Sequence, residues 1–182
     1  MTDRPAAKPK RPRKPTPDDR IPEIIIEPRL DDYLAVMTRA VFQAGVSWAL
    51  IDSKWDAFRT AFHDFDPHSV AAFDDLDLER LANDEHILRS RRKIEGTIQN
   101  ARTLLALDRE HGGFRCWLAA FENYDQASAA LRNAFRFLGE LSVYYLLFRT
   151  GHDVPPFEQW ELTIEGDHPR MREMVRRARE HA

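Results

Sequence analysis

The apolar residues of this chain recur at helical spacing almost from end to end, and this periodicity limits the folds open to it. Leu30, Leu34, Met37 and Val41 step by four, three and four residues, so they share one face of a helix. The same spacing returns further along, in the stretches 51–62, 94–105 and 171–178. The sequence therefore predicts an all-α domain built from several short helices.

Capping and turn residues divide this pattern into separate helices. Ser47 can cap a helix that begins at residue 48, and Asp66 with Pro67 begins a short one. A longer helix is expected over 85–110, with Ile94, Ile98, Ala101 and Leu105 inward. Before the first helix, three isoleucines at 24–26 lie between prolines, so a docked extended segment is expected there rather than a strand.

Length and charge predict one domain with a tail. The chain has 182 residues, enough for a single well-packed domain, which we assign to 21–182. Residues 1–20 hold seven basic and three acidic residues with five prolines and no apolar run, so they are expected to be disordered. This basic tail is either a sequence-blind tether to phosphates or a solubilising extension.

The cysteine count and the hydropathy exclude several classes of protein. Cys116 is the single cysteine of the chain, so neither a disulfide framework nor a thiolate metal site is expected. No apolar run approaches the roughly 20 residues of a membrane span, and the N-terminus lacks the apolar core of a secretory signal. The expected protein is cytoplasmic, with no cofactor and no metal.

The stretch "FRFLGELSV" (135–143) has the pattern of a helix-hairpin-helix turn. In such a turn Gly139 lets the backbone approach a DNA phosphate, and the start of the next helix offers N–H groups and a positive dipole end. This contact holds DNA without reading its sequence. Taken alone, the pattern also fits an ordinary turn between two helices.

Four stretches in a fixed order give the turn more weight. They are "FQAGVSW" (42–48), "FDP" (65–67), "ILRSRRKIEGTIQNAR" (87–102) and "FRFLG" (135–139). Together they resemble the 3-methyladenine DNA glycosylase I family, from about residue 30 to residue 151. The resemblance implies an all-α helix-hairpin-helix glycosylase fold. It also implies a base-excision repair hydrolase that extrudes an alkylated purine from double-stranded DNA and cleaves its N-glycosidic bond.

The resemblance assigns base-binding positions to Trp48, Gln43 and Ala40. Trp48 matches the tryptophan that stacks on the extruded base, although a tryptophan at a helix start is also a common core residue. Ala40 stands where the family carries its base-recognising acid. The family's N-terminal pocket segment has no counterpart here. Its zinc ligands are also missing, because "VPP" (154–156) replaces its Asn-Asp-His, and no zinc is expected.

The remaining site residues follow from position. In the wider superfamily a catalytic aspartate lies shortly after the hairpin's second helix, which makes Glu158 and Asp153 candidate catalytic acids; the alternative is that both are solvated loop acids.

Five residues are candidate contacts to the DNA backbone, with an ordinary solvated face as the alternative for the positive cluster around residue 91. They are Arg136, Gly139, Ser142, Arg91 and Lys93.

Two further functions stay open beside the monomeric glycosylase. One is a DNA-binding protein that recognises damaged or bent DNA without catalysis, favoured by Ala40 and by the missing pocket segment. The other is a helical domain that has lost DNA altogether, favoured by the negative charge of the body. Retention of Trp48 in its "QAG" setting argues for the enzyme, because a DNA clamp would not need it.

Overall fold

The computed structural model describes residues 24–180, and all secondary structure in that range is helical. The expected all-α fold is thus confirmed. The α-helices are α1 (Leu30–Gln43), α2 (Trp48–Ala61), α3 (Pro67–Ala71), α4 (Asp75–Asn83), α5 (Arg91–Glu110), α6 (Phe114–Ala119), α7 (Tyr124–Ala134), α8 (Glu140–Arg149), α9 (Phe157–Trp160) and α10 (Pro169–Glu180). Short 3-10 turns lie at His63–Phe65 and Glu161–Thr163.

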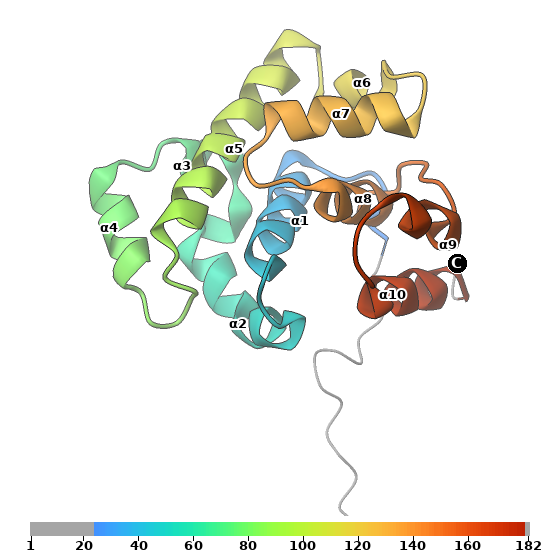
Figure 1. The fold of residues 1–182 in the computed structure, drawn as a ribbon. Helices are drawn as coiled ribbons and strands as arrows, with labels where there is room; N and C mark the ends of the chain where they lie inside the picture. Colours follow the sequence, from blue (N-terminus) through green and yellow to red (C-terminus); the bar gives the residue numbers. More distant parts are fainter. Residues whose placement is uncertain (1–23, 181–182) are drawn as a thin grey trace, which may run out of the picture.

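Helix α1 lies at the centre of the molecule, with α5 and α8 packed against it (Figure 1). The helices α2, α3 and α4 form one side, α6 and α7 cover one end, and α9 and α10 lie together on the opposite side (Figure 1). No helix within residues 24–180 has the length and apolar character needed to cross a membrane.

The core follows the predicted helical stripe closely. On α1, Leu34, Met37 and Val41 are completely buried, as the spacing predicts. On α5 the stripe ends differently, because Leu104 is buried while the expected Leu105 is only half-buried. Positions three and four residues after Ala101 both border the stripe, and packing across the helix selects between them.

Several boundaries differ from those expected. Helix α5 begins at Arg91 and not near residue 85, because the preceding residues form a turn after α4. Helix α4 itself was not predicted. It is started by Asp74, whose carboxylate accepts from the N–H groups of Leu76 and Asp77 at 2.9 and 3.1 Å. This aspartate cap is a signal that the sequence contains.

The segment before α1 docks as expected. The Ile25 N–H donates to the carbonyl of Arg149 at the end of α8 at 2.9 Å, and no strand forms. A second hydrogen bond joins α1 to the chain after α8, between the Tyr33 hydroxyl and Nε2 of His152 at 2.8 Å. Burial lowers the pKa of His152 and raises that of Tyr33 to about 12. The tail over 1–20 lies outside the described residues.

Candidate nucleic-acid interface

The loop between α1 and α2 carries the residues with the strongest sequence signal. Gly45 has φ +75°, a backbone conformation that favours glycine, and Ser47 occupies the N-cap of α2. Trp48 is therefore the first residue of α2, at a helix mouth rather than in a helix centre. Its side chain is half-buried, which leaves part of the ring accessible to a ligand.

Two side chains from distant parts of the chain contact the Trp48 ring. Tyr145 of α8 meets it edge-to-face, with ring centroids 5.7 Å apart. The guanidinium of Arg170, on α10, lies over the indole at 5.7 Å from its centroid. Burial lowers the pKa of Arg170. The indole is therefore already in contact with a cation, the kind of group that an aromatic face attracts.

Lys93 holds the loop that leads to Trp48. Its Nζ donates to the carbonyl of Ala44 at 2.8 Å and lies 5.8 Å from the ring centroid of Phe42. Burial lowers the pKa of this ammonium group. The structure thus turns Lys93, expected to contact a phosphate, toward main-chain oxygens of its own protein.

The two other predicted base-binding positions lie on α1. Ala40 and Gln43 are 5% and 6% exposed, so neither offers much surface. The carboxylate nearest in sequence to Trp48 is that of Asp52, one helical turn further along α2. It pairs with Arg39 at 3.2 Å, and the Arg39 guanidinium lies 4.2 Å from the ring centroid of Trp55.

The stretch 135–139 forms the expected turn between α7 and α8. Phe135 and Leu138 are buried, while Arg136 and Gly139 are exposed. The left-handed conformation falls on Phe137, with φ +60°, and not on the glycine, with φ −80°. A methyl group added to Gly139 would meet no atom within 4 Å, so the protein itself leaves this side of the turn open.

The start of α8 has the features of an anion site. No side chain caps it, so its first N–H groups are left for an external acceptor. Ser142, in this first turn, is half-buried. Within residues 24–180, Arg136 and Arg92 beside the turn make no ion pair. Arg91, in contrast, pairs with Glu79 and with Glu95, although exposed pairs of this kind are weak and exchange easily.

The two candidate acids lie on α9 and in the loop before it. Glu158 is exposed on α9, which is anchored by Phe157 and by Trp160, whose ring centroid lies 4.4 Å from that of Tyr144. Asp153 is exposed in the loop before it. Neither residue lines either of the two cavities that lie beside α8.

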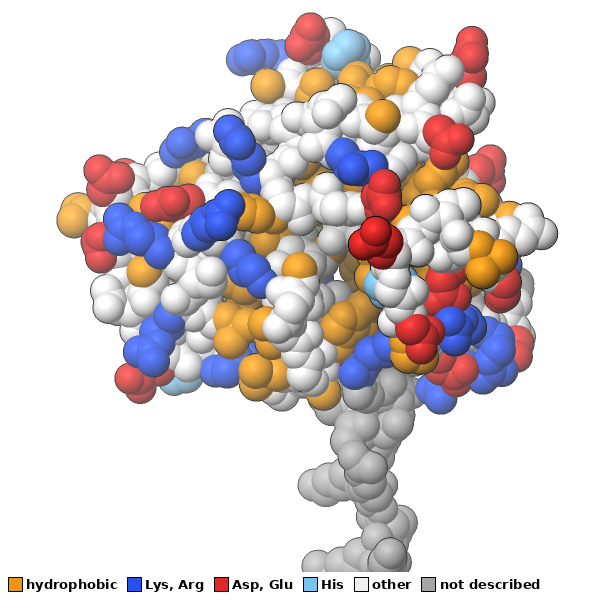
Figure 2. Space-filling view, in the orientation of Figure 1, with side chains coloured by type: hydrophobic (Ala, Val, Ile, Leu, Met, Phe, Trp, Pro, Cys, Tyr) orange, Lys and Arg blue, Asp and Glu red, His pale blue; other side chains and the backbone are white. Residues whose placement is uncertain are grey.

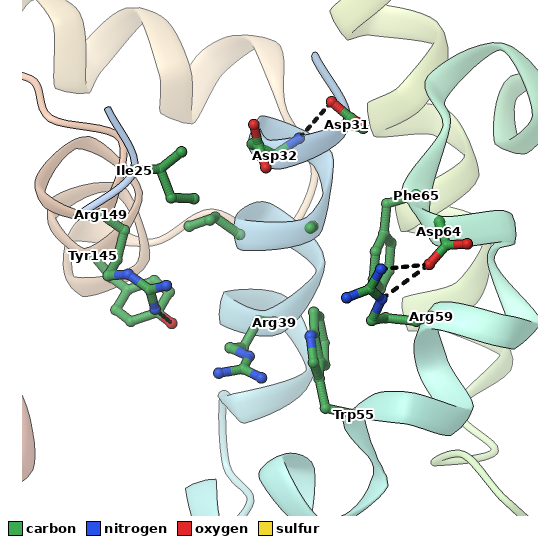
Figure 3. A pocket seen from close by; sticks show the side chains of 12 residues that line it. Ile25, Asp31, Asp32, Arg39, Trp55, Arg59, Asp64, Phe65, Tyr145 and Arg149 are labelled. Carbon is green, nitrogen blue, oxygen red and sulfur yellow. Dashed lines mark hydrogen bonds and ion pairs between the residues drawn. The ribbon is translucent and has the colours of Figure 1, made fainter. Parts of the chain in front are cut away.

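One cavity, of about 300 Å³, lies between α1, α2 and α8 (Figure 3). The side chains of Arg39 and Trp55 point into it from one side and Tyr145 and Arg149 from the other (Figure 3). The rest of its wall is formed by Ile25, Asp31, Asp32, Ala35, Val36, Arg59, Asp64 and Phe65. No predicted site residue lines this cavity.

The second cavity, of about 480 Å³, lies at the start of α8. Gly139 and Ser142 line it, together with the segment that leads from α9 to α10. The surface around these elements is mixed in charge. Lys and Arg side chains gather over α4 and the start of α5 and again over α10, with hydrophobic side chains showing in the hollow between them (Figure 2).

The sequence interpretation missed the contacts that organise the interface. Arg170 carried no signal, because its partner Trp48 is far away in the sequence. Asn100 lay within a quoted motif but was given no role. Its side chain is 1% exposed and binds the main chain of Arg136. A buried polar residue on a helix face is the available signal for such a contact.

An all-α fold with an open glycine turn before α8 and an accessible tryptophan at the start of α2 fits the helix-hairpin-helix class of DNA glycosylase-like domains. The chain belongs to the methyladenine glycosylase family, whose sequence profile matches residues 31–138.

Named relatives and solved structures agree with this family. Over 82 residues the chain is 40% identical to DNA-3-methyladenine glycosylase 1 of Escherichia coli (strain K12), and 33% identical to DNA-3-methyladenine glycosylase of Haemophilus influenzae. Each match covers 45% of this chain and 44% of the relative, less than half the length of these relatives.

The structural similarity covers more of the chain than the sequence matches do. A crystal structure of 3-methyladenine DNA glycosylase I superposes with a TM-score of 0.62 at 26% identity, covering 71% of this chain and 82% of that one. The 3-methyladenine DNA glycosylase I of Staphylococcus aureus gives a TM-score of 0.63 at 23% identity, over 75% and 83% of the two chains, which shows the shared fold.

Proposed function

We propose that this protein is a base-excision DNA repair enzyme of the 3-methyladenine DNA glycosylase I type. It binds double-stranded DNA, extrudes an alkylated purine and hydrolyses its N-glycosidic bond. The observation that carries the proposal is the half-buried Trp48 at the mouth of α2, inside the segment that matches the family. Relatives of the matched segment bear the name of this activity.

The residues divide into two groups in this reaction. Trp48 stacks on the extruded base, with Gln43 and Ala40 bordering it. Arg136, Gly139, Ser142 and Arg91 hold the DNA backbone. An alkylated purine is cationic in DNA and leaves readily, so stacking and exclusion of water supply part of the catalysis.

The catalytic acid is the open part of the mechanism. Alanine at position 40 can neither accept a hydrogen bond from the base nor stabilise a cationic sugar. Glu158 and Asp153 are the proposed replacements, and both are exposed in the free protein. For either to act, the bound DNA must bring the sugar to the α9 side of the molecule.

The direct test is release of free bases from methylated duplex DNA, measured by mass spectrometry. Wild type is expected to release methylpurines, and Glu158→Gln is expected to lose most of that release. Ala40→Glu restores a carboxylate at the family position and is expected to raise the rate. Ala40→Gln adds the same bulk without charge and serves as its control, since position 40 is 95% covered.

The second candidate function is DNA binding without catalysis. It is favoured by Ala40 and by the fact that neither candidate acid lines the cavities of about 300 and 480 Å³. Release by Ala40→Glu but not by wild type indicates a glycosylase scaffold that has lost its chemistry. No release by any variant, with DNA binding retained, contradicts the enzyme and supports the binding protein.

The proposed working form is a cytoplasmic monomer that needs neither zinc nor a cofactor. Pro155 and Pro156 stand where the family has polar and zinc-ligating residues. Tyr144 donates to the carbonyl of Pro155 at 2.8 Å, so in this chain a buried hydrogen bond fastens that corner.

Replacing Arg170 tests whether the free protein covers its own stacking surface. Arg170→Ala is expected to raise the affinity for DNA with an alkylated base about two- to five-fold, because a half-buried cation–π contact must break before a base can stack on Trp48. Fluorescence anisotropy with labelled duplexes measures the change. Arg176→Ala, an exposed arginine on the same helix, controls for the lost charge. A larger loss with Arg170→Ala than with the control contradicts the prediction and makes Arg170 a DNA contact.

A further inference from the structure

The side chain of Asn100 is bound to both main-chain groups of a single residue in the hairpin turn. Its Oδ1 accepts from the Arg136 N–H at 2.7 Å, and its Nδ2 donates to the Arg136 carbonyl at 3.1 Å. Asn100 is 1% exposed, so this pair of hydrogen bonds is shielded from water. A buried amide that satisfies a donor and an acceptor at once fixes the orientation of the peptide units on both sides.

The next residue of the turn is seated on the same helix. A Cβ atom added to Gly96 would lie 2.5 Å from Cε2 of Phe137, so the ring occupies the space left by the missing side chain. The Arg92 guanidinium also lies over this ring, 5.1 Å from its centroid. Arg136 and Phe137 are thus both fastened to α5, by different kinds of contact.

The same part of α5 also fastens the loop before Trp48. Lys93, whose Nζ donates to the Ala44 carbonyl, lies about one helical turn before Gly96 on α5. From Lys93 to Asn100 the helix rises about 10 Å. In Figure 1 the chain between α7 and α8 passes beside α5, and α1 packs against the same helix. One rigid helix therefore sets the separation between the hairpin turn and the loop that carries Trp48.

We propose that Asn100 is a positioning residue for damaged DNA. It sets the place of the hairpin backbone relative to Trp48, so that a strand held at the hairpin delivers its extruded base to the indole. This inference rests on the proposed function, because it requires both contacts to act on one DNA strand. Phosphate contacts alone tolerate a loose turn, but two contacts on one strand require a fixed spacing.

The test compares two affinities rather than one. Binding is measured by anisotropy, at one salt concentration, for a duplex with a non-cleavable analogue of an alkylated purine nucleotide and for the same duplex undamaged. In Asn100→Ala the preference for the damaged duplex is expected to fall about ten-fold, while affinity for the undamaged duplex changes less than about two-fold. Arg136→Ala, which removes a charge, is expected to weaken both alike.

Thr97→Val is the matched control for a merely structural effect. Thr97 is as buried as Asn100, lies on the same helix, and donates only to the Lys93 carbonyl at 3.0 Å. The Thr97→Val protein is expected to keep the preference for damaged DNA, even if its free energy of unfolding falls as much as that of Asn100→Ala. A folded Asn100→Ala protein that keeps the full preference overturns the inference.

A second measurement separates this inference from the proposed function. If wild type shows no preference for damaged DNA, the proposed function fails. Amide hydrogen exchange of the free proteins over 136–139 then decides whether Asn100 fixes the hairpin turn. Faster exchange there in Asn100→Ala than in wild type and Thr97→Val supports positioning of the hairpin. Equal exchange in all three proteins overturns it.

Discussion

Trp48→Ala is expected to weaken binding to DNA with an alkylated base by about ten- to a hundred-fold, the range that loss of one base–aromatic stack produces. The side chain is half-buried and begins α2, so its truncation removes an accessible aromatic surface without opening the centre of the core. Affinity for undamaged duplex is expected to stay within about two-fold, because the backbone contacts lie elsewhere. Anisotropy with paired damaged and undamaged duplexes measures both.

Trp48→Phe provides the matched control for this substitution. Phenylalanine keeps an aromatic face but a smaller one, so an intermediate affinity is expected. Both variants lose part of the contact with Tyr145, and thermal unfolding reports whether either is destabilised. Unchanged affinity of Trp48→Ala for the damaged duplex would remove the main support for the glycosylase.

Gly96→Ala is expected to lower DNA affinity by about ten-fold although alanine is the better helix residue. In an open position on a helix this change stabilises by about 1 kcal/mol. Here the new methyl group would lie 2.5 Å from the ring of Phe137, and such overpacking costs about 1–3 kcal/mol. The ring is 37% exposed and can move outward, so the turn is expected to shift while the free energy of unfolding changes little.

Gly139→Ala is the control for Gly96→Ala. Position 139 has room for a methyl group and an ordinary φ of −80°, so the free Gly139→Ala protein is expected to keep the hairpin turn unchanged. Weaker DNA binding by both variants, with chemical shifts at Phe137 altered in Gly96→Ala alone, is the expected pattern. Normal DNA affinity of a folded Gly96→Ala protein contradicts the link between the seating of Phe137 and DNA binding.

Local rules account for most of the secondary structure. The four-three-four spacing on α1 predicts the buried Leu34, Met37 and Val41, because periodicity in sequence is periodicity around a helix. The Asp66 cap is also present, its carboxylate accepting from the Ser69 N–H at 2.9 Å. The same rules placed the start of α5 too early, because helical spacing continues through the turn before Arg91.

The candidate site was predicted in outline and not in detail. The motif 135–139 gives the turn and its position, but not the left-handed conformation of Phe137, whose ring is seated against Gly96. The spacing after the hairpin indicated Glu158 as a candidate catalytic acid, and this role is a proposal. Whether it reaches a bound sugar depends on how DNA sits against α9, which no spacing along the chain determines.

The sequence by itself determined most of the helices, the turn and the family, because these depend on residues close together in the chain. Only the tertiary structure decided which partners the polar side chains take. Lys93 turns to a carbonyl 49 residues earlier, and Asn100 to a peptide 36 residues later. The physical reason is burial: each side chain lies where helices meet, and there a polar group must pair with whatever packing brings within reach.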